Sequence, residues 1–132
     1  DVRPVNLFLT EDGVLKLGYY GLTTQAECYS IKKTNCDGVR SFAPEVFEGE
    51  YEMESDMWSL GTTLLELMGI KPNYLYKNNR FHNVNGDFEW PFDVDAIESA
   101  SLTDFVIKCF EERVRKRWSV IKLMNVSVMG GE

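Results

Sequence analysis

Residues 55–69, SDMWSLGTTLLELMG, constrain the fold of this chain more than any other stretch. Apolar side chains recur there at three- and four-residue steps, which is the spacing of one face of an α-helix. Ser55 is suited to cap the start of this helix and Gly69 to end it. Trp58 and Leu67 widen the apolar surface beyond one stripe, so we expect a helix that is buried on most sides at the centre of a core. The periodic residues are Met57, Leu60, Leu64, Leu65 and Met68.

The segments before this helix predict short elements. Two strand-like runs, NLFLT and VLKLG, flank the turn signal EDG, so we expect a hairpin from about Asn6 to Gly18. Residues 22–40 have no sustained period and predict a long loop of the kind that is usually functional or mobile. Pro44 suits the first turn of a short helix, and Gly49 suits its end.

The segments after the central helix predict a polar region and two closing helices. Residues 70–91 are Asn-rich, and we expect only short helical turns there. Ser101 is expected to cap a helix in LTDFVIKCFEE, and Ser119 to begin a second one in VIKLM. The first of these helices has its apolar face at Leu102, Phe105, Val106, Cys109 and Phe110. The sequence therefore predicts a mainly α domain with a small β-hairpin over residues 1–126, and a tail at 127–132.

Composition excludes several classes of function. The 132 residues suffice for one compact domain, and a net charge of −7 argues against a nucleic-acid partner, because such binding relies on concentrated Lys and Arg. Cys28, Cys36 and Cys109 form no C-x-x-C pair, so neither a disulfide framework nor a zinc site is indicated, and a reducing, cytoplasmic setting is expected. His82 is the sole histidine, which is too few for a His-based metal site. No apolar run reaches membrane-spanning length.

Five motifs occur in a meaningful order: DVRPVN at 1–6, GYYG at 18–21, APE at 43–45, SDMWSLG at 55–61 and DFVIKCFEERVRKR at 104–117. Together they make the chain resemble the C-terminal lobe of a eukaryotic protein kinase from Asp1 to about Met124. LTEDG and LLELMGIKPNY lean towards the sterile-type serine/threonine kinases of the mitogen-activated cascades.

The resemblance assigns roles to three residues of DVRPVN. Asp1 matches the base that orients the substrate hydroxyl, and Asn6 matches a magnesium ligand. Arg3 stands where the family has a lysine that helps to neutralise the transferring phosphate. Arg keeps the positive charge but changes its geometry.

The motif GYYG departs from the Asp-Phe-Gly of the family. Tyr19 occupies the position of the Asp that binds the magnesium ion bridging the nucleotide phosphates. A phenol titrates at about pH 10, so Tyr19 is neutral and offers no carboxylate oxygen, and a severe loss of phosphoryl transfer is expected. The threonine that the family has before APE is also missing, since Gly38, or Val39 if one residue is deleted, stands in its place.

Four further residues match structural positions of the family. The resemblance implies that Glu45 pairs with Arg117, that Asp56 holds the backbone of the catalytic loop, and that Trp58 packs beneath the activation segment. Five residues of the predicted loop are candidate phosphorylation sites, with ordinary loop polarity as the alternative reading. They are Thr23, Thr24, Tyr29, Ser30 and Thr34.

The chain contains no G-x-G-x-x-G loop and no other part of an N-terminal kinase lobe. ATP and magnesium are implied by the family, but their site is incomplete, so no cofactor is assigned. We predict a pseudokinase that acts as a binding or scaffold module for protein partners. The alternatives are an active ATP-dependent serine/threonine kinase whose N-terminal lobe is missing from this chain, and a remnant with no biochemical role. The face around residues 6–20 would be uncovered, so self-association is expected.

Overall fold

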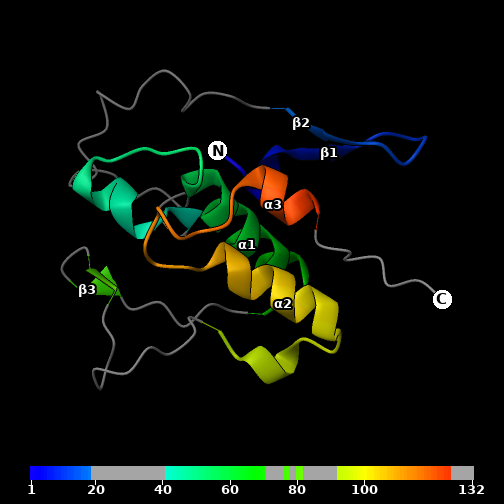
Figure 1. The fold of residues 1–132 in the computed structure, drawn as a ribbon. Helices are drawn as coiled ribbons and strands as arrows, with labels where there is room; N and C mark the ends of the chain where they lie inside the picture. Colours follow the sequence, from blue (N-terminus) through cyan, green and yellow to red (C-terminus); the bar gives the residue numbers. More distant parts are fainter. Residues whose placement is uncertain (19–40, 71–75, 78–79, 82–91, 126–132) are drawn as a thin grey trace.

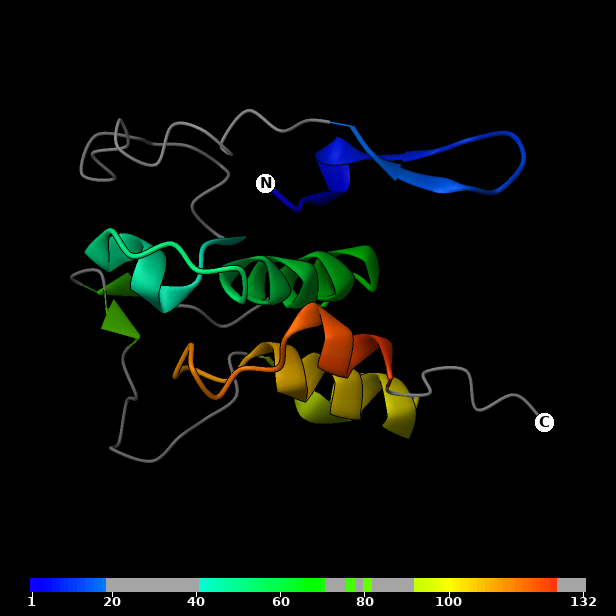
Figure 2. The same cartoon turned by 45° about the horizontal axis from the view of Figure 1, so that its top comes forward.

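The central helix α1, Ser55–Leu67, organises the molecule. The structure is a computed structural model that describes residues 1–18, 41–70, 76–77, 80–81 and 92–125. The N-terminal segment lies on one side of α1, and the helices α2, Ala100–Cys109, and α3, Val120–Met124, lie on the other, as Figure 2 shows for the fold labelled in Figure 1. The helix predicted over residues 55–69 is therefore confirmed as α1, and it occupies the expected central place.

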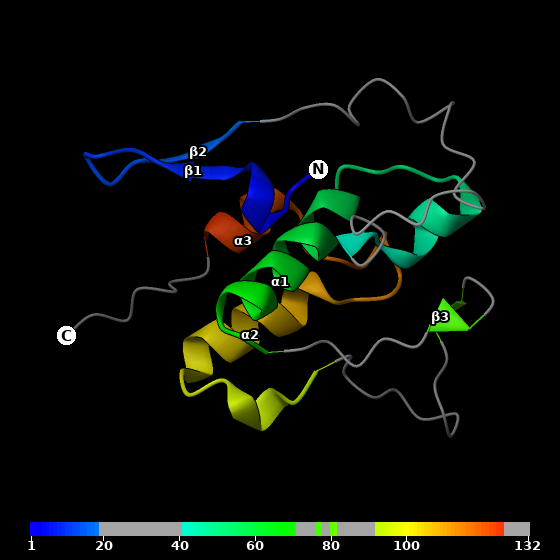
Figure 3. The ribbon, with the colours of Figure 1, turned by 180° about the vertical axis from the view of Figure 1, so that it is seen from behind.

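The chain begins with a 3₁₀ turn and a hairpin. The turn η1, Pro4–Asn6, leads into β1, Leu7–Leu9, which pairs antiparallel with β2, Leu15–Leu17. Gly13 lies in the connection with φ 79°, a conformation that glycine adopts without steric cost. The predicted hairpin is confirmed, and it extends away from the helices (Figures 1 and 3).

A short helix begins within the APE motif, at Pro44. It is the 3₁₀ helix η4, Pro44–Glu48, and Gly49 ends it with φ 87°. The predicted short helix is thus present, in the tighter 3₁₀ form.

The expectation of helical turns alone between residues 70 and 91 is wrong for the part that the structure describes. Tyr76–Lys77 (β3) and Arg80–Phe81 (β4) form a second antiparallel hairpin. The sequence carries the signal in retrospect, because the aromatic residues Tyr76 and Phe81 favour strands.

Two of the predicted helix starts are displaced. The N-cap of α2 is Ser99, whose hydroxyl accepts a hydrogen bond from the amide of Leu102, so the expected cap at Ser101 is wrong by two residues. The residue before α1 is Glu54, and the Ser55 hydroxyl is not a cap because it is directed to another segment. Ser119 does precede α3, as predicted. A last short 3₁₀ turn, η5, Val94–Ala96, precedes α2.

The core lies where α1 meets α2. Trp58 and Phe110 contact edge to face, with 4.8 Å between ring centroids, and Phe92 packs beside Phe110 at 5.4 Å. The buried cluster consists of Ala43, Val46, Trp58, Leu65, Phe92, Ile97, Val106 and Phe110. Cys109 is also fully buried, and burial raises the pKa of its thiol to about 12, so it is no nucleophile at neutral pH.

The buried face of α1 matches its apolar spacing only in part: Trp58 and Leu65 are buried and Leu64 packs against the core, but the end of the helix is open. Leu67 is 63% exposed and Met68 is also exposed. The hydroxyl residues Ser59, Thr62 and Thr63 are buried instead, since each donates a hydrogen bond to a backbone carbonyl. None of the helices in the described part of the chain combines the length and the hydropathy that a membrane-spanning segment needs.

Candidate active site

Asp1, Arg3 and Asn6 form one hydrogen-bonded cluster. Arg3 contacts both carboxylate oxygens of Asp1, with Nε 2.7 Å from Oδ1 and Nη2 2.8 Å from Oδ2. The Asn6 amide donates to the Asp1 carbonyl oxygen at 2.7 Å and to Oδ2 at 3.0 Å. The Asp1 side chain is only 2% exposed. The three positions that the sequence analysis singled out are therefore brought together at the start of the hairpin.

Helix α1 holds this cluster through a residue that the sequence analysis missed. Thr63 donates its hydroxyl to the carbonyl of Val2 at 3.0 Å, across 61 positions of sequence, and to Ser59 at 2.8 Å. A threonine within an apolar helix was the available signal, but nothing in the sequence identified its partner. Asp56, expected in this role, is exposed, and its carboxylate has no hydrogen-bond partner among the described residues.

The described residues do not fit a magnesium ion. Asn6 directs its amide hydrogens to Asp1, so its Oδ1 is the atom that could face a cation. The Asp1 carboxylate is paired with Arg3, and no group of three or more His, Cys, Asp or Glu gathers in this part of the chain. Magnesium is usually held by one or two carboxylates besides water and phosphate oxygens. A single amide oxygen does not meet that requirement.

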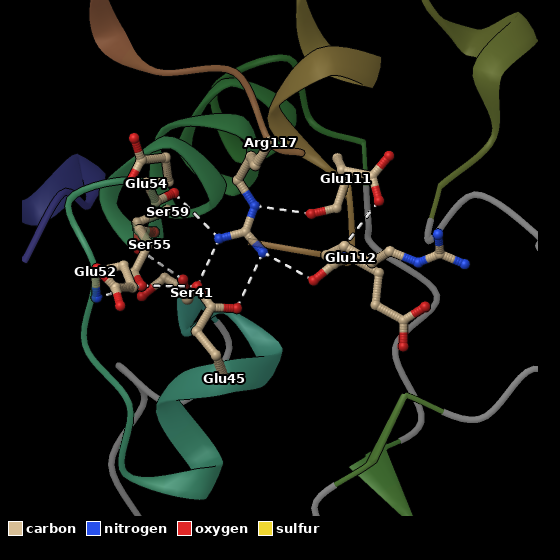
Figure 4. Close-up of polar contacts among 10 residues, drawn as sticks. Ser41, Glu45, Glu52, Glu54, Ser55, Ser59, Glu111, Glu112 and Arg117 are labelled. Atoms are coloured by element: carbon tan, nitrogen blue, oxygen red, sulfur yellow. Dashed lines mark hydrogen bonds and ion pairs between the residues drawn. The ribbon is translucent and has the colours of Figure 1, made fainter. Parts of the chain in front are cut away.

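Glu45 and Arg117 form a buried ion pair, as the resemblance implied (Figure 4). The pair is bidentate: Nη1 lies 2.6 Å from Oε1 and Nη2 lies 3.0 Å from Oε2. Ser55 adds a hydrogen bond to Oε1 at 2.7 Å. Arg117 also donates to the backbone carbonyls of Glu54, Glu111 and Glu112. This network joins η4, the start of α1 and the segment after α2.

The environment of Glu45 favours the charged carboxylate. Burial alone would raise its pKa, but hydrogen bonds from Arg117 and Ser55, together with the charge of Arg117, outweigh burial. The pKa of Glu45 therefore lies below its ordinary value of 4.5. This supports a structural role, because the carboxylate is buried and both of its oxygens already accept hydrogen bonds, Oε1 from Arg117 and Ser55 and Oε2 from Arg117.

Trp58 lies in the core beside this network. The Arg117 guanidinium stands 5.1 Å from the ring centroid of Trp58, in addition to the contact between Trp58 and Phe110. Ser59, one position along, donates to the carbonyl of Ser41 at 2.8 Å and so anchors the residues that lead into APE. The expected packing of Trp58 beneath the activation segment stays a prediction, because most of that segment is not described.

Several predicted site residues lie outside the described part of the chain. Tyr19 is one of them, and so are Gly38 and Val39 before APE. The candidate phosphorylation sites are the others: Thr23, Thr24, Tyr29, Ser30 and Thr34.

The protein kinase domain, as a sequence family, matches residues 1–129. Serine/threonine-protein kinase Nek9 of Xenopus laevis is 30% identical over 98% of this chain, which corresponds to 14% of that protein. Mitogen-activated protein kinase kinase kinase 1b of Physcomitrium patens is 30% identical over the whole chain, and mitogen-activated protein kinase kinase kinase 17 of Arabidopsis thaliana is 26% identical over 95% of it. The chain spans 18% and 35% of these two proteins. By this match and by its motifs, the chain belongs to the eukaryotic protein kinase family, serine/threonine type.

Proposed function

We propose that this chain is the C-terminal lobe of a pseudokinase, which binds protein partners in signalling and transfers no phosphate. The main support for this proposal is the set of groups at the positions that bind magnesium in the family. The described residues supply one amide oxygen, from Asn6, and Tyr19 stands in the sequence where the family has a carboxylate. Without the magnesium ion, the charge that develops on the transferring phosphoryl group is not stabilised.

The alternative is an active kinase whose N-terminal lobe lies outside this chain. One observation favours it: Asp1 and Asn6 are both kept, and they contact each other directly. Loss of catalysis would have removed the need for either residue.

The experiment uses a protein extended upstream to include an N-terminal lobe. Phosphoryl transfer from ATP to a generic serine/threonine substrate is measured in the wild type, in Tyr19→Asp and in the control Tyr19→Phe. Thermal stabilisation by ATP is measured with and without magnesium. We expect no transfer and no magnesium-dependent stabilisation in the wild type and in Tyr19→Phe, and magnesium-dependent stabilisation in Tyr19→Asp. Transfer by the wild type that Asp1→Asn abolishes would establish the active kinase instead.

The same proposal includes protein partners and a cytoplasmic location. The exposed apolar residues of the first hairpin, Leu9 and Leu15 among them, support a surface that proteins cover. The cysteine pattern supports a reducing compartment, and we place the protein in the cytoplasm. The acidic charge supports partners other than nucleic acid.

A further inference from the structure

We propose that Arg3 masks the carboxylate of Asp1 and so prevents a substrate hydroxyl from reaching the residue at the catalytic-base position. The inference rests on the proposed function and deepens it, because it identifies a second obstacle to catalysis that is independent of Tyr19. Arg3 acts here through Asp1 and is a positioning residue.

The geometry of the pair carries the proposal. A carboxylate has two oxygens, and both are contacted: Oδ1 by Nε of Arg3, and Oδ2 by Nη2 of Arg3 and by the Asn6 amide. The contacts to Oδ2, at 2.8 and 3.0 Å, are charge-assisted hydrogen bonds, whereas Oδ1 lies 2.7 Å from Nε in an ion-pair contact that lacks hydrogen-bond geometry.

The burial of Asp1 indicates that its carboxylate oxygens cannot accept a hydrogen bond from a substrate hydroxyl. A general base must come within about 2.6–3.2 Å of the proton that it receives. The Asp1 side chain is 2% exposed even though 27% of the Arg3 side chain is open to solvent. Arg3 therefore lies over Asp1 as a cover, and a substrate hydroxyl cannot approach either oxygen while the pair is formed.

The difference between arginine and lysine explains why this position matters. The guanidinium is a rigid planar fork that matches both oxygens of a carboxylate at once. The lysine that the family has at this position is a flexible point charge, which can contact a phosphate and leave a carboxylate oxygen open. Arg3→Lys should thus uncover Asp1 without removing the positive charge.

The test measures access to the carboxylate without nucleotide or metal. The full chain is treated with a carbodiimide and an amine, and the labelling rate of each carboxylate is followed by peptide mass spectrometry. Asp56, which is exposed, serves as the open reference, and Glu45, which is buried, reports on the integrity of the fold. Wild type, Arg3→Lys and Arg3→Gln are compared with Arg115→Lys, a control at an exposed arginine.

In the wild type we expect Asp1 to be labelled about tenfold more slowly than Asp56, which corresponds to about 1.4 kcal/mol of protection. Both Arg3 variants should raise the Asp1 rate by about the same factor, while Glu45 stays unlabelled and Arg115→Lys changes nothing. Asp1 labelling as fast as that of Asp56 in the wild type would overturn the proposal, and so would an unchanged Asp1 rate in both Arg3 variants. A joint rise of Asp1 and Glu45 in both variants would also overturn it, because Arg3 would then only support the fold. None of these outcomes depends on phosphoryl transfer, so the masking of Asp1 and the pseudokinase assignment can fail separately.

Discussion

A single guanidinium, that of Arg117, joins three segments of the chain. Its five N–H groups are matched by five hydrogen bonds, two of them to Glu45 and three to backbone carbonyls. A buried charge is tolerated when it is paired and fully hydrogen-bonded in this way. The energetic consequence is asymmetric, since removal of one partner leaves the other charge buried and uncompensated.

Glu45→Gln should therefore destabilise the chain strongly. The variant keeps the shape of the side chain but leaves Arg117 without its counter-charge, so we expect a loss of about 3–5 kcal/mol in the free energy of unfolding. Urea denaturation at pH 7 measures it. The control is Asp104→Asn, which breaks the exposed ion pair with Lys108 and should cost less than about 1 kcal/mol. Equal effects of the two substitutions would contradict the buried-pair account.

The same residue makes stability depend on pH. The pKa of Glu45 is lowered in the folded chain, so the unfolded chain binds more protons as the pH falls through 4.5. The contribution of Glu45 is fully present above this value and is lost as the pH falls through the lower folded pKa. The difference in unfolding free energy between wild type and Glu45→Gln should thus shrink below pH 4.5, as urea titrations between pH 7 and 3 would show. A constant difference over this range would contradict the lowered pKa.

At the scale of the element, α1 carries a hydroxyl stripe, defined here as Ser55, Ser59 and Thr63. The three residues follow at four-residue steps and so lie on one helix face. Each donates to a different segment: Ser55 to Glu45, Ser59 to Ser41 and Thr63 to Val2. The stripe explains why polar residues are buried in this helix, because its role is to anchor backbone and side-chain acceptors of neighbouring segments.

Thr63→Val tests the stripe at the N-terminal segment. The substitution keeps the shape of the side chain and removes the bond to Val2, so we expect a loss of about 1 kcal/mol and faster hydrogen exchange over residues 1–9. Thr62→Val is the matched control, since its hydroxyl bonds only to Ser59 within the helix. Similar exchange over residues 1–9 in both variants would mean that Thr63 does not anchor this segment.

Gly61→Ala tests the contact between α1 and α2. A Cβ at Gly61 would stand 2.8 Å from Cβ of Cys109 and 2.9 Å from the Phe110 ring, so the helices would have to separate. Alanine is the better helix former by about 1 kcal/mol, yet we expect net destabilisation of about 1–3 kcal/mol because overpacking outweighs propensity. Glu66→Ala, at an exposed position of the same helix, should change stability by less than about 0.5 kcal/mol. A stabilising Gly61→Ala, measured by urea denaturation, would refute the close approach.

At the scale of the molecule, the sequence predicted secondary-structure elements better than the long-range contacts between residues of the chain. Periodicity located α1, and the turn signal located the first hairpin, because both are encoded by neighbouring residues. The pairing of Glu45 with Arg117, 72 residues apart, came from the family motifs alone, since no local pattern specifies such a contact. The contact between Thr63 and Val2 and the masking of Asp1 by Arg3 were not predicted. They depend on how α1 presents its side chains to the N-terminal segment and on the orientation of one side chain.

At and beside the first hairpin, large apolar side chains are exposed, and from them we predict association of the chain. Val5, Phe8, Leu9, Val14 and Leu15 are all more than half exposed. Leu9 and Leu15 are cross-strand partners, so their side chains lie on the same face of the hairpin and form one apolar patch exposed to water. We therefore expect concentration-dependent self-association of the isolated chain in light scattering and sedimentation.

Paired substitutions locate the surface responsible for this association. Leu9→Lys combined with Leu15→Glu replaces apolar surface by opposite charges that can pair across the strands, and it should make the chain monomeric. Ile121→Lys combined with Met124→Glu places the same charges on a second exposed apolar surface, on α3, and should leave association unchanged. If the wild type is a monomer at every concentration, the hairpin does not drive association. If only the α3 variant becomes monomeric, the contact surface is α3, because the two pairs differ in position and not in charge.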